Sequence, residues 1–178
     1  RNFRQPLQKA FRSLEVGLDG LEPRIITRKD PELSRARSLD MSTLRYATSF
    51  RLLKIRQAFF EGQQLEDIFK ITKIDPWFLN QIRIIVKKQN IFSLKELKQN
   101  GFSDRQIARL KNTSEMEIRK SRINNNILPS YKLVDTCAAE FVSETPYCYS
   151  TYDEENEIKP LDGKKVIIIG GGPNRIGQ

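Results

Sequence analysis

A glycine-rich segment near residue 170 holds the side chains with the clearest potential for chemistry. The apolar run 166–169 is followed by three glycines and Pro173, and then by Asn174 and Arg175. Glycines in such a place let the backbone approach a phosphate and point N–H groups toward it. The segment therefore predicts one of two roles: direct contact of Asn174 and Arg175 with an anion, or a purely structural turn.

The standard nucleotide signatures are incomplete in this segment. Arg175 stands where the dinucleotide pattern G-x-G-x-x-G has its third glycine. Gly172 and Gly177 have the spacing of a phosphate-binding loop, but Gln178 replaces the lysine which that loop requires. The pattern favours the first turn of a Rossmann-like α/β unit without a nucleotide signature of its own.

Residues 101–123 imitate a helix-turn-helix, the motif that places a helix in the major groove of DNA. A recognition helix at 114–123 would offer three cations to phosphates. These cations are Arg119, Lys120 and Arg122. Two acidic residues, Glu115 and Glu117, stand in the turn that would enter the groove. A helical packing unit is favoured, and an independent nucleic-acid-binding module is the alternative.

Hydrolytic and metal chemistry of the usual kinds is disfavoured by composition. The chain contains no histidine, so a Ser or Cys triad lacks its base. Cys137 and Cys148 have no partners at zinc-ligand spacing. We expect two reduced, partly buried thiols, with a disulfide as the alternative.

The bulk composition is typical of a globular segment. Of 178 residues, 38% are apolar and 30% charged, and no run approaches the roughly 18 apolar residues that a membrane span needs. The net charge of +9 indicates little about partners, because the cations are interspersed with acidic residues. The sequence opens without Met and stops in the glycine-rich turn, so we expect a piece of a longer polypeptide and no signal peptide.

Most of the chain has the apolar periodicity of short amphipathic helices. We expect helices at 5–16, from 31, at 49–60, 65–69, from 76, and at 93–99, 103–110 and 114–123. Asp75-Pro76 supplies an N-cap and a first-turn proline, and Ser93 and Ser114 each have a glutamate at capping-box spacing. Four side chains are expected to serve core packing or self-association: Phe59, Trp77, Phe78 and Ile82.

The periodicity weakens after the last of these helices. Residues 128–157 are expected to be extended, irregular chain packed on another part of the protein. Residues 164–169 are then predicted to form a buried strand that leads into the glycine-rich turn.

Long stretches of the sequence resemble the large subunit of carbamoyl phosphate synthetase, in the same order and over nearly the whole chain. The matching stretches are 7–17, 74–82, 101–104, 117–120, 131–141 (YKLVDTCAAEF), 149–152 (YSTY) and 170–178 (GGGPNRIGQ). The resemblance implies a mainly α fold: a helical oligomerisation domain, followed by the first β-strand and glycine-rich turn of an α/β, Rossmann-like pre-ATP-grasp unit. It also implies three parts. Residues 1–20 would be the tail of a first synthetic unit, 21–162 the oligomerisation domain with its linker, and 163–178 the start of a second synthetic unit.

The same resemblance implies a function for the longer protein. Such a large subunit is a carbon–nitrogen ligase that makes carbamoyl phosphate from bicarbonate and ammonia, for arginine and pyrimidine biosynthesis. It uses ATP with Mg²⁺ or Mn²⁺, and a small glutaminase subunit supplies the ammonia. This chain would be an inactive, cytoplasmic, self-associating connector with no catalytic or metal-binding residue. Asn174, Arg175 and Gly177 would lie beside the passage for the carbamate intermediate.

Overall fold

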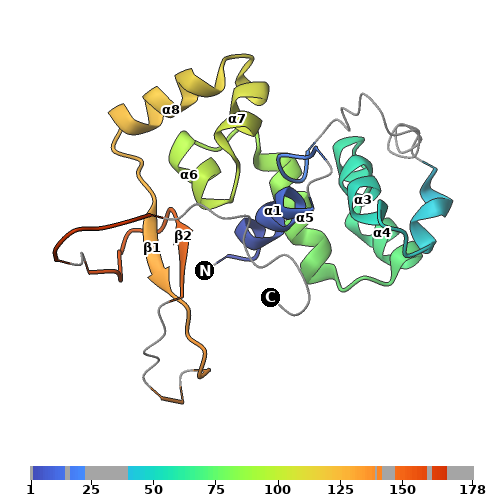
Figure 1. The fold of residues 1–178 in the computed structure, drawn as a ribbon. Coiled ribbons are helices and arrows are strands. Elements are labelled where there is room, and N and C mark those ends of the chain that lie inside the picture. The colour runs from blue at the N-terminus through green and yellow to red at the C-terminus, as the bar shows by residue number, and fades with distance from the viewer. Residues whose placement is uncertain are drawn as a thin grey trace. The chain divides into compact units, whose positions relative to one another are not determined.

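The computed structural model describes residues 2–14, 17–22, 40–138, 140–141, 147–159 and 162–167. The chain forms two compact units (Figure 1). Unit 1 comprises residues 1–129 together with 151–153, and unit 2 comprises 130–150 and 154–178. The helix predicted from residue 31 lies outside the described residues.

Unit 1 is built from short helices, which confirms the mainly α class. In chain order the described elements are α1 (Arg4–Ser13), the 3-10 helix η1 (Met41–Arg45), α3 (Arg51–Phe60), α4 (Leu65–Thr72), α5 (Pro76–Lys88), α6 (Leu94–Gln99), α7 (Asp104–Lys111) and α8 (Glu115–Asn124). The longest, α5, has 13 residues. Such short helices depend on tertiary packing rather than on intrinsic helix propensity.

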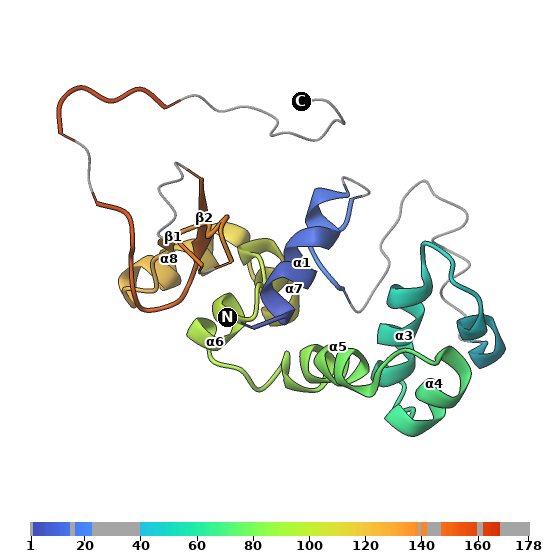
Figure 2. The same ribbon diagram turned by 90° about the horizontal axis from the view of Figure 1, so that it is seen from below.

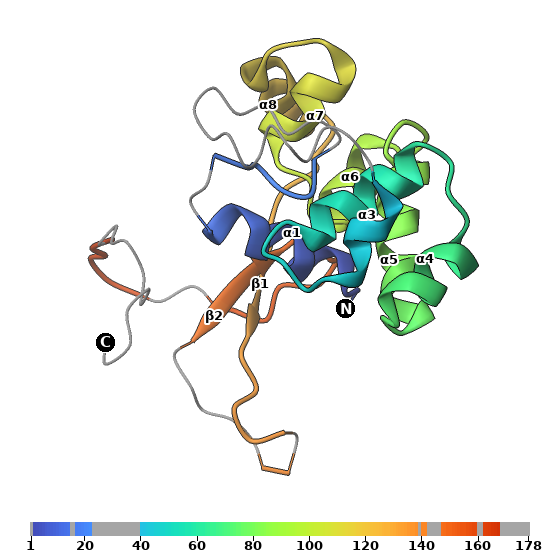
Figure 3. The ribbon, with the colours of Figure 1, turned by 90° about the vertical axis from the view of Figure 1, so that its right-hand side faces the viewer.

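Helix α5 is central to the packing of unit 1. It contacts α3, α4 and α1, while η1 packs on α3 and α4 (Figure 2). Its buried side chains Leu79, Ile82 and Ile85 are at most 3% exposed, and they join one continuous apolar core. Helices α7 and α8 form a second packed pair (Figure 3).

The helix starts follow the sequence signals closely. Capping boxes are present at Ser93 and Ser114, as predicted, and a third is present at Ser103, where Gln106 takes the place of glutamate. The Asp75 side chain accepts a hydrogen bond from the Trp77 backbone N–H at 2.7 Å, with Pro76 in the first turn. Each box satisfies N–H groups that a helix start leaves without partners.

The capping box of α8 predicts an acid-sensitive helix start. Hydrogen bonds from the Thr113 hydroxyl, the Ser114 backbone and the Ser114 hydroxyl lower the pKa of Glu117 to about 2. Because the folded state favours the ionised carboxylate, this contribution to stability is complete above the unfolded pKa near 4.5. It is lost as the pH falls from there through 2. We expect a carboxyl NMR titration midpoint near 2 for Glu117. The Glu117→Gln variant should lose part of the acid dependence of unfolding, and an ordinary midpoint would contradict this assignment.

Unit 2 contains a small two-stranded sheet where the sequence predicted irregular extended chain. Strand β1 (Ser130–Leu133) pairs with β2 (Cys148–Thr151) in an antiparallel arrangement. The Val134 N–H donates to the Tyr147 carbonyl at 2.9 Å and continues the ladder. The prediction of extended chain was correct, but the pairing was missed because the partners are separated by a segment without a recognisable hairpin turn.

The predicted buried strand at 164–169 is not supported by the described residues. Residues 164–167 are described and form no strand, and Val166 and Ile167 are each 87% exposed. A strand needs a neighbouring strand to satisfy its N–H and C=O groups, and the described residues provide none here. The remaining residues of that prediction, 168 and 169, lie outside the described part.

Candidate linker-docking site

A tight helix ending brings α1 against the turn between α6 and α7. The Gly101 N–H donates to the Lys98 carbonyl and the Phe102 N–H to the Leu97 carbonyl, both at 3.0 Å, which is the Schellman pattern. Gly101 has a φ of +84°. A Cβ added to it would lie 2.7 Å from the Gln5 Cα and 2.9 Å from the Gln5 carbonyl oxygen. This close backbone approach places the side chain of Gln5 beside the α6–α7 turn.

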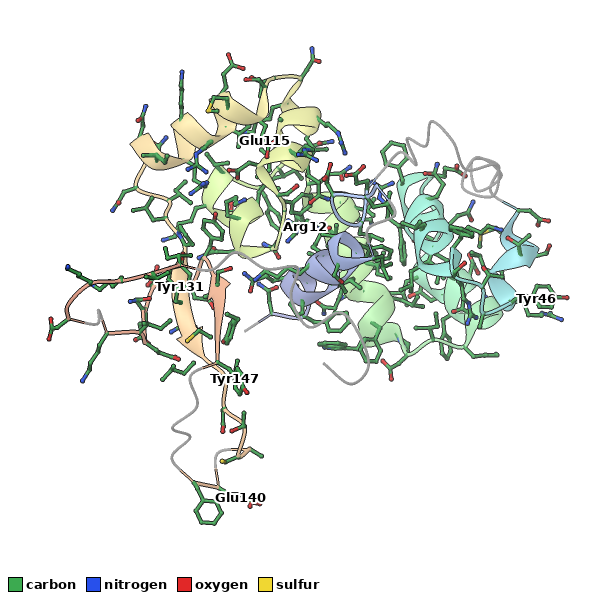
Figure 4. The ribbon with its side chains drawn as sticks, viewed as in Figure 1. Arg12, Tyr46, Glu115, Tyr131, Glu140 and Tyr147 are labelled. Atoms are coloured by element: carbon green, nitrogen blue, oxygen red, sulfur yellow. The ribbon has the colours of Figure 1, made fainter. Side chains whose placement is uncertain are left out.

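The Arg12 side chain reinforces the same approach. Its Nη1 donates to the Gly101 carbonyl at 2.8 Å and to the Asp19 carbonyl at 3.3 Å. Figure 4 shows Arg12 between α1 and the helices that follow α5. The loop at 17–22 is thereby held on the same turn.

Ion pairs on α7 complete the hold on that loop. Arg109 pairs with Glu22 at 2.6 Å and with Asp19 at 2.7 Å. Burial raises the pKa of Glu22, which is 6% exposed, and the charge of Arg109 opposes that shift. The loop carboxylates are thus fixed partners of α7 and have no free reactive role.

Thr151, the last residue of β2, and the next two residues of the linker, Tyr152 and Asp153, belong to unit 1. The Thr151 side chain is buried, at 1% exposed. Its hydroxyl lies 3.1 Å from Gln5 Nε2 and 3.2 Å from Gln5 Oε1, and 3.0 Å from Asp153 Oδ2. Thr151 is therefore docked on the helix that Gly101 places.

The ring of Tyr152 rests on two buried cations. Lys98 Nζ lies 4.9 Å and the Arg122 guanidinium carbon 5.6 Å from the ring centroid. Cations over an aromatic face are attracted by its quadrupole, more strongly when they are desolvated. The Tyr152 carbonyl also accepts from Gln99 Nε2 at 3.4 Å. Helices α6 and α8 thus both hold this one linker residue.

Asp104 neutralises part of this buried charge. It accepts from Lys98 Nζ at 2.6 Å and from Arg122 Nε at 3.3 Å. Lys98 also donates to the Phe102 carbonyl, and Arg122 to the Ile127 carbonyl. Burial lowers the pKa of Lys98, and the hydrogen bond to Asp104 opposes the shift. Two cations share one carboxylate, so the electron-rich Tyr152 ring helps to compensate the remaining positive charge.

We call Thr151, Tyr152 and Asp153 with their contacts on α1, α6 and α8 the linker clamp. Its chemistry is that of docking, since every cation in it has a structural partner. Within the described ranges, no three His, Cys, Asp or Glu side chains are arranged to hold a metal ion. The clamp fixes the course of the chain where it leaves the helical unit.

Removing the Tyr152 ring should release the linker. In a Tyr152→Leu variant we expect amide exchange of residues 148–156 to accelerate by about tenfold or more, because the cation–ring and associated contacts are lost. The measurement is hydrogen–deuterium exchange by mass spectrometry. Tyr147→Leu is the matched control, because that side chain is 65% exposed (Figure 4). Equal acceleration in both variants would show that the ring contacts do not fix the segment.

The structure separates the four side chains predicted for packing or self-association into two kinds. Phe59 and Ile82 are each 3% exposed and lie in the core. Trp77 and Phe78 are 52% and 44% exposed and form a surface cluster with Phe3. The role of these four in self-association stays a prediction.

The predicted passage residues Asn174, Arg175 and Gly177 lie outside the described residues, so their role also stays a prediction.

The helix-turn-helix alternative loses one of its three phosphate-binding side chains. Arg122 is 7% exposed and is engaged in the linker clamp. Neither cysteine forms a disulfide; Cys137 is partly buried as expected, whereas Cys148 is exposed.

Sequence reasoning missed the clamp. The stretch YSTY was singled out only for its resemblance, within a segment that was expected to be irregular chain packed on another part of the protein. Lys98 falls on the inward side of a six-residue helix, too short for a clear periodic signal. Only the helix–linker contact itself, between residues about 50 positions apart, shows their relation.

One buried cation of the core has an unusual environment. Arg56 on α3 is 1% exposed, and its Nε and Nη1 have no hydrogen-bond partner among the residues that the structure describes. Its Nη2 lies 3.4 Å from Gln89 Oε1, and its guanidinium stacks on Phe60 with 5.3 Å to the ring centroid. Burial lowers the pKa of Arg56 to about 9. This side chain is a source of strain in the core rather than a binding group.

Comparison with known proteins assigns the helical unit. Residues 1–126 match the family described as "Carbamoyl-phosphate synthetase large chain, oligomerisation domain". The chain belongs to this family. Membership of an oligomerisation-domain family supports self-association, and it gives no support to the nucleic-acid-binding alternative.

Whole-chain similarity extends the match beyond residue 126. The chain is similar to the carbamoyl phosphate synthase large chains of Neisseria meningitidis serogroup B (45% identical), Vibrio cholerae (44%) and Archaeoglobus fulgidus (42%). Each alignment covers 100% of this chain but only 17% or 18% of the relative. The chain therefore spans about one sixth of the length of the relatives that it matches.

The domain boundaries predicted at residues 20 and 162 stay predictions. In the structure α1 packs on α5 within unit 1, and the family match begins at residue 1.

Among the described residues, every helix is too short or too polar to traverse a bilayer.

Proposed function

We propose that this chain is the self-associating connector of a carbamoyl phosphate synthase large chain. In this proposal the helical unit holds two synthetic units at a fixed spacing and joins large chains to one another. The linker clamp carries the proposal from the structure, because it locks the outgoing chain onto three helices. The family match and the names of the relatives support the same assignment.

The chemistry belongs to the longer protein in this proposal. That protein would be a cytoplasmic ligase that consumes ATP with Mg²⁺ or Mn²⁺ and bicarbonate, with ammonia from a glutaminase subunit, in arginine and pyrimidine biosynthesis. Among the described residues, no three His, Cys, Asp or Glu side chains are grouped to hold a metal ion, and the ATP and its metal ion belong to the longer protein in this proposal. Any role of Asn174, Arg175 and Gly177 along a carbamate passage is part of the same proposal.

Sedimentation and turnover test the connector proposal together. We expect the purified chain to self-associate in a concentration-dependent way by analytical ultracentrifugation. We also expect it to show no bicarbonate-dependent ATP hydrolysis. A chain that stays monomeric at all concentrations would overturn the self-association, and robust ATP turnover would overturn the assignment as an inactive connector. A gel shift with DNA that weakens steeply with salt would instead favour the nucleic-acid-binding alternative.

A further inference from the structure

A cluster of three aromatic rings lies at the start of α5, where Trp77 and Phe78 are exposed and Phe3 is half-buried. Phe3 contacts Trp77 and Phe78, each at 5.3 Å between ring centroids, and Trp77 contacts Phe78 at 4.9 Å. All three pairs are edge-to-face, the geometry that aromatic rings prefer. We call these three residues the aromatic triad.

The triad gives α5 a second apolar face. The first face, with Leu79, Ile82 and Ile85, is buried in the core of unit 1. Trp77 and Phe78 point elsewhere and remain 52% and 44% exposed. Single exposed apolar side chains are ordinary, whereas contiguous exposed rings are typical of a surface that another molecule covers.

The rings are also held in position before any partner arrives. Each contacts the other two, and Asp75 caps the helix that bears Trp77 and Phe78. Rigid aromatic side chains lose little conformational entropy on binding, and tryptophan is enriched among the residues that dominate interface energies. The triad thus has the properties of an interface anchor.

We propose that the aromatic triad is the surface through which two copies of this chain associate. The inference rests on the proposed self-association and names the face that carries it. Lys73 and Asp75, both exposed, precede the triad and have opposite charges. In a two-fold symmetric contact the same patch meets itself, so Lys73 of one copy can face Asp75 of the other. Such a pair offsets the repulsion expected between chains of net charge +9.

The size of the patch sets the strength of the contact. A stable interface buries about 800 Å² per partner, and a fully exposed aromatic side chain contributes about 150–250 Å². Three partly exposed rings supply less than that area. The association is therefore a reversible equilibrium that depends on concentration.

Trp77 reports directly on this surface because it is the chain's single tryptophan. The experiment follows tryptophan emission and iodide quenching of the purified chain across a dilution series, alongside sedimentation equilibrium. As the chain associates, we expect the emission to shift to the blue and quenching to weaken. If association leaves Trp77 equally accessible, another face makes the contact and the inference is overturned. If Trp77 is protected at every dilution, a segment of the same chain covers the triad, which also overturns it.

Substitutions separate this inference from the proposed function. Phe78→Gln should weaken association and raise the dissociation constant by about tenfold or more, as expected for an anchor side chain. Trp77 remains in this variant as the reporter. Tyr46→Gln is the matched control: Tyr46, which follows the last residue of η1, is 67% exposed (Figure 4), and its substitution should leave association unchanged. Wild-type association that Phe78→Gln does not weaken would overturn the triad alone. A monomeric wild type would overturn self-association itself.

A charge test probes the pairing across the two-fold axis. Lys73→Glu should weaken association, since it places a carboxylate opposite Asp75 of the second copy. Adding Asp75→Asn, which keeps a capping side chain but removes the charge, should restore part of the loss. An unchanged dissociation constant in Lys73→Glu would contradict the symmetric pairing.

Discussion

Replacing Gly101 by alanine is expected to destabilise the helical unit by roughly 2–5 kcal/mol, the sum of two separate effects. A non-glycine residue in the left-handed region costs about 1–2 kcal/mol. The added Cβ also meets the backbone of Gln5 at 2.7 Å, and backbone cannot swing away as a flexible side chain can. Relief would require α1 to separate from the α6–α7 turn, at a further cost of about 1–3 kcal/mol.

Gly62 provides a matched control on α3. It ends that helix in the same hydrogen-bonding pattern, since Gly62 N–H donates to Phe59 and Gln63 N–H to Ala58. Its φ is +90°, but a Cβ there would meet nothing within 4 Å. Chemical denaturation should give Gly62→Ala only the conformational cost of about 1–2 kcal/mol. Equal losses in the two variants would show that the approach of Gln5 to Gly101 has no energetic weight.

Replacing Arg56 by methionine is expected to stabilise the helical unit by about 1–4 kcal/mol. The guanidinium is desolvated, and two of its nitrogens have no hydrogen-bond partner in the described part of the chain. Methionine has a similar length, fills the same space and carries no charge to desolvate. The lowered pKa of Arg56 indicates the same destabilisation. Because the folded state disfavours the protonated guanidinium, Arg56 opposes folding at every pH below about 9, where it is charged.

Arg51, on the same helix, should respond in the opposite direction. Its Nε donates to the Leu44 carbonyl at 2.8 Å and its Nη2 to the Thr72 carbonyl at 2.7 Å. Arg51→Met leaves both carbonyls without these partners, at a cost of about 1.5–3 kcal/mol. Thermal or urea unfolding of both variants tests the pair. A loss of stability in Arg56→Met would mean that its stacking on Phe60 outweighs the desolvation.

Local signals in the sequence predicted the helical unit well because helix boundaries depend on contacts between residues that are close in the sequence. The caps at Asp75, Ser93 and Ser114 each involve residues two or three positions apart, and all three are present. The third capping box, at Ser103, was missed because glutamine takes the glutamate position there. These features depend on neighbours in the chain and hardly on the fold.

Contacts between distant residues could not be read from the sequence in the same way. The docking of Thr151 on Gln5 joins positions 146 residues apart, and nothing in either local pattern indicates it. Trp77 was expected to support packing or self-association, but periodicity alone cannot show that its ring lies on a surface with Phe3. The exposed state of Val166 and Ile167 was mispredicted for a related reason. An apolar run indicates a preference for burial, whereas burial itself requires a partner.

The return of the linker to unit 1 has a topological consequence. Both ends of the stretch 130–150 are attached to one body, at Pro129 and at Thr151. That stretch is therefore a loop with both ends fixed. The entropic cost of closing such a loop rises slowly with its length, by about 0.6 kcal/mol for each doubling. A reporter peptide inserted beside Glu140, which lies far along this loop from both fixed ends (Figure 4), should leave the thermal unfolding of the helices almost unchanged. Because its ends are anchored, this stretch is a suitable insertion site for labelling or lengthening the connector.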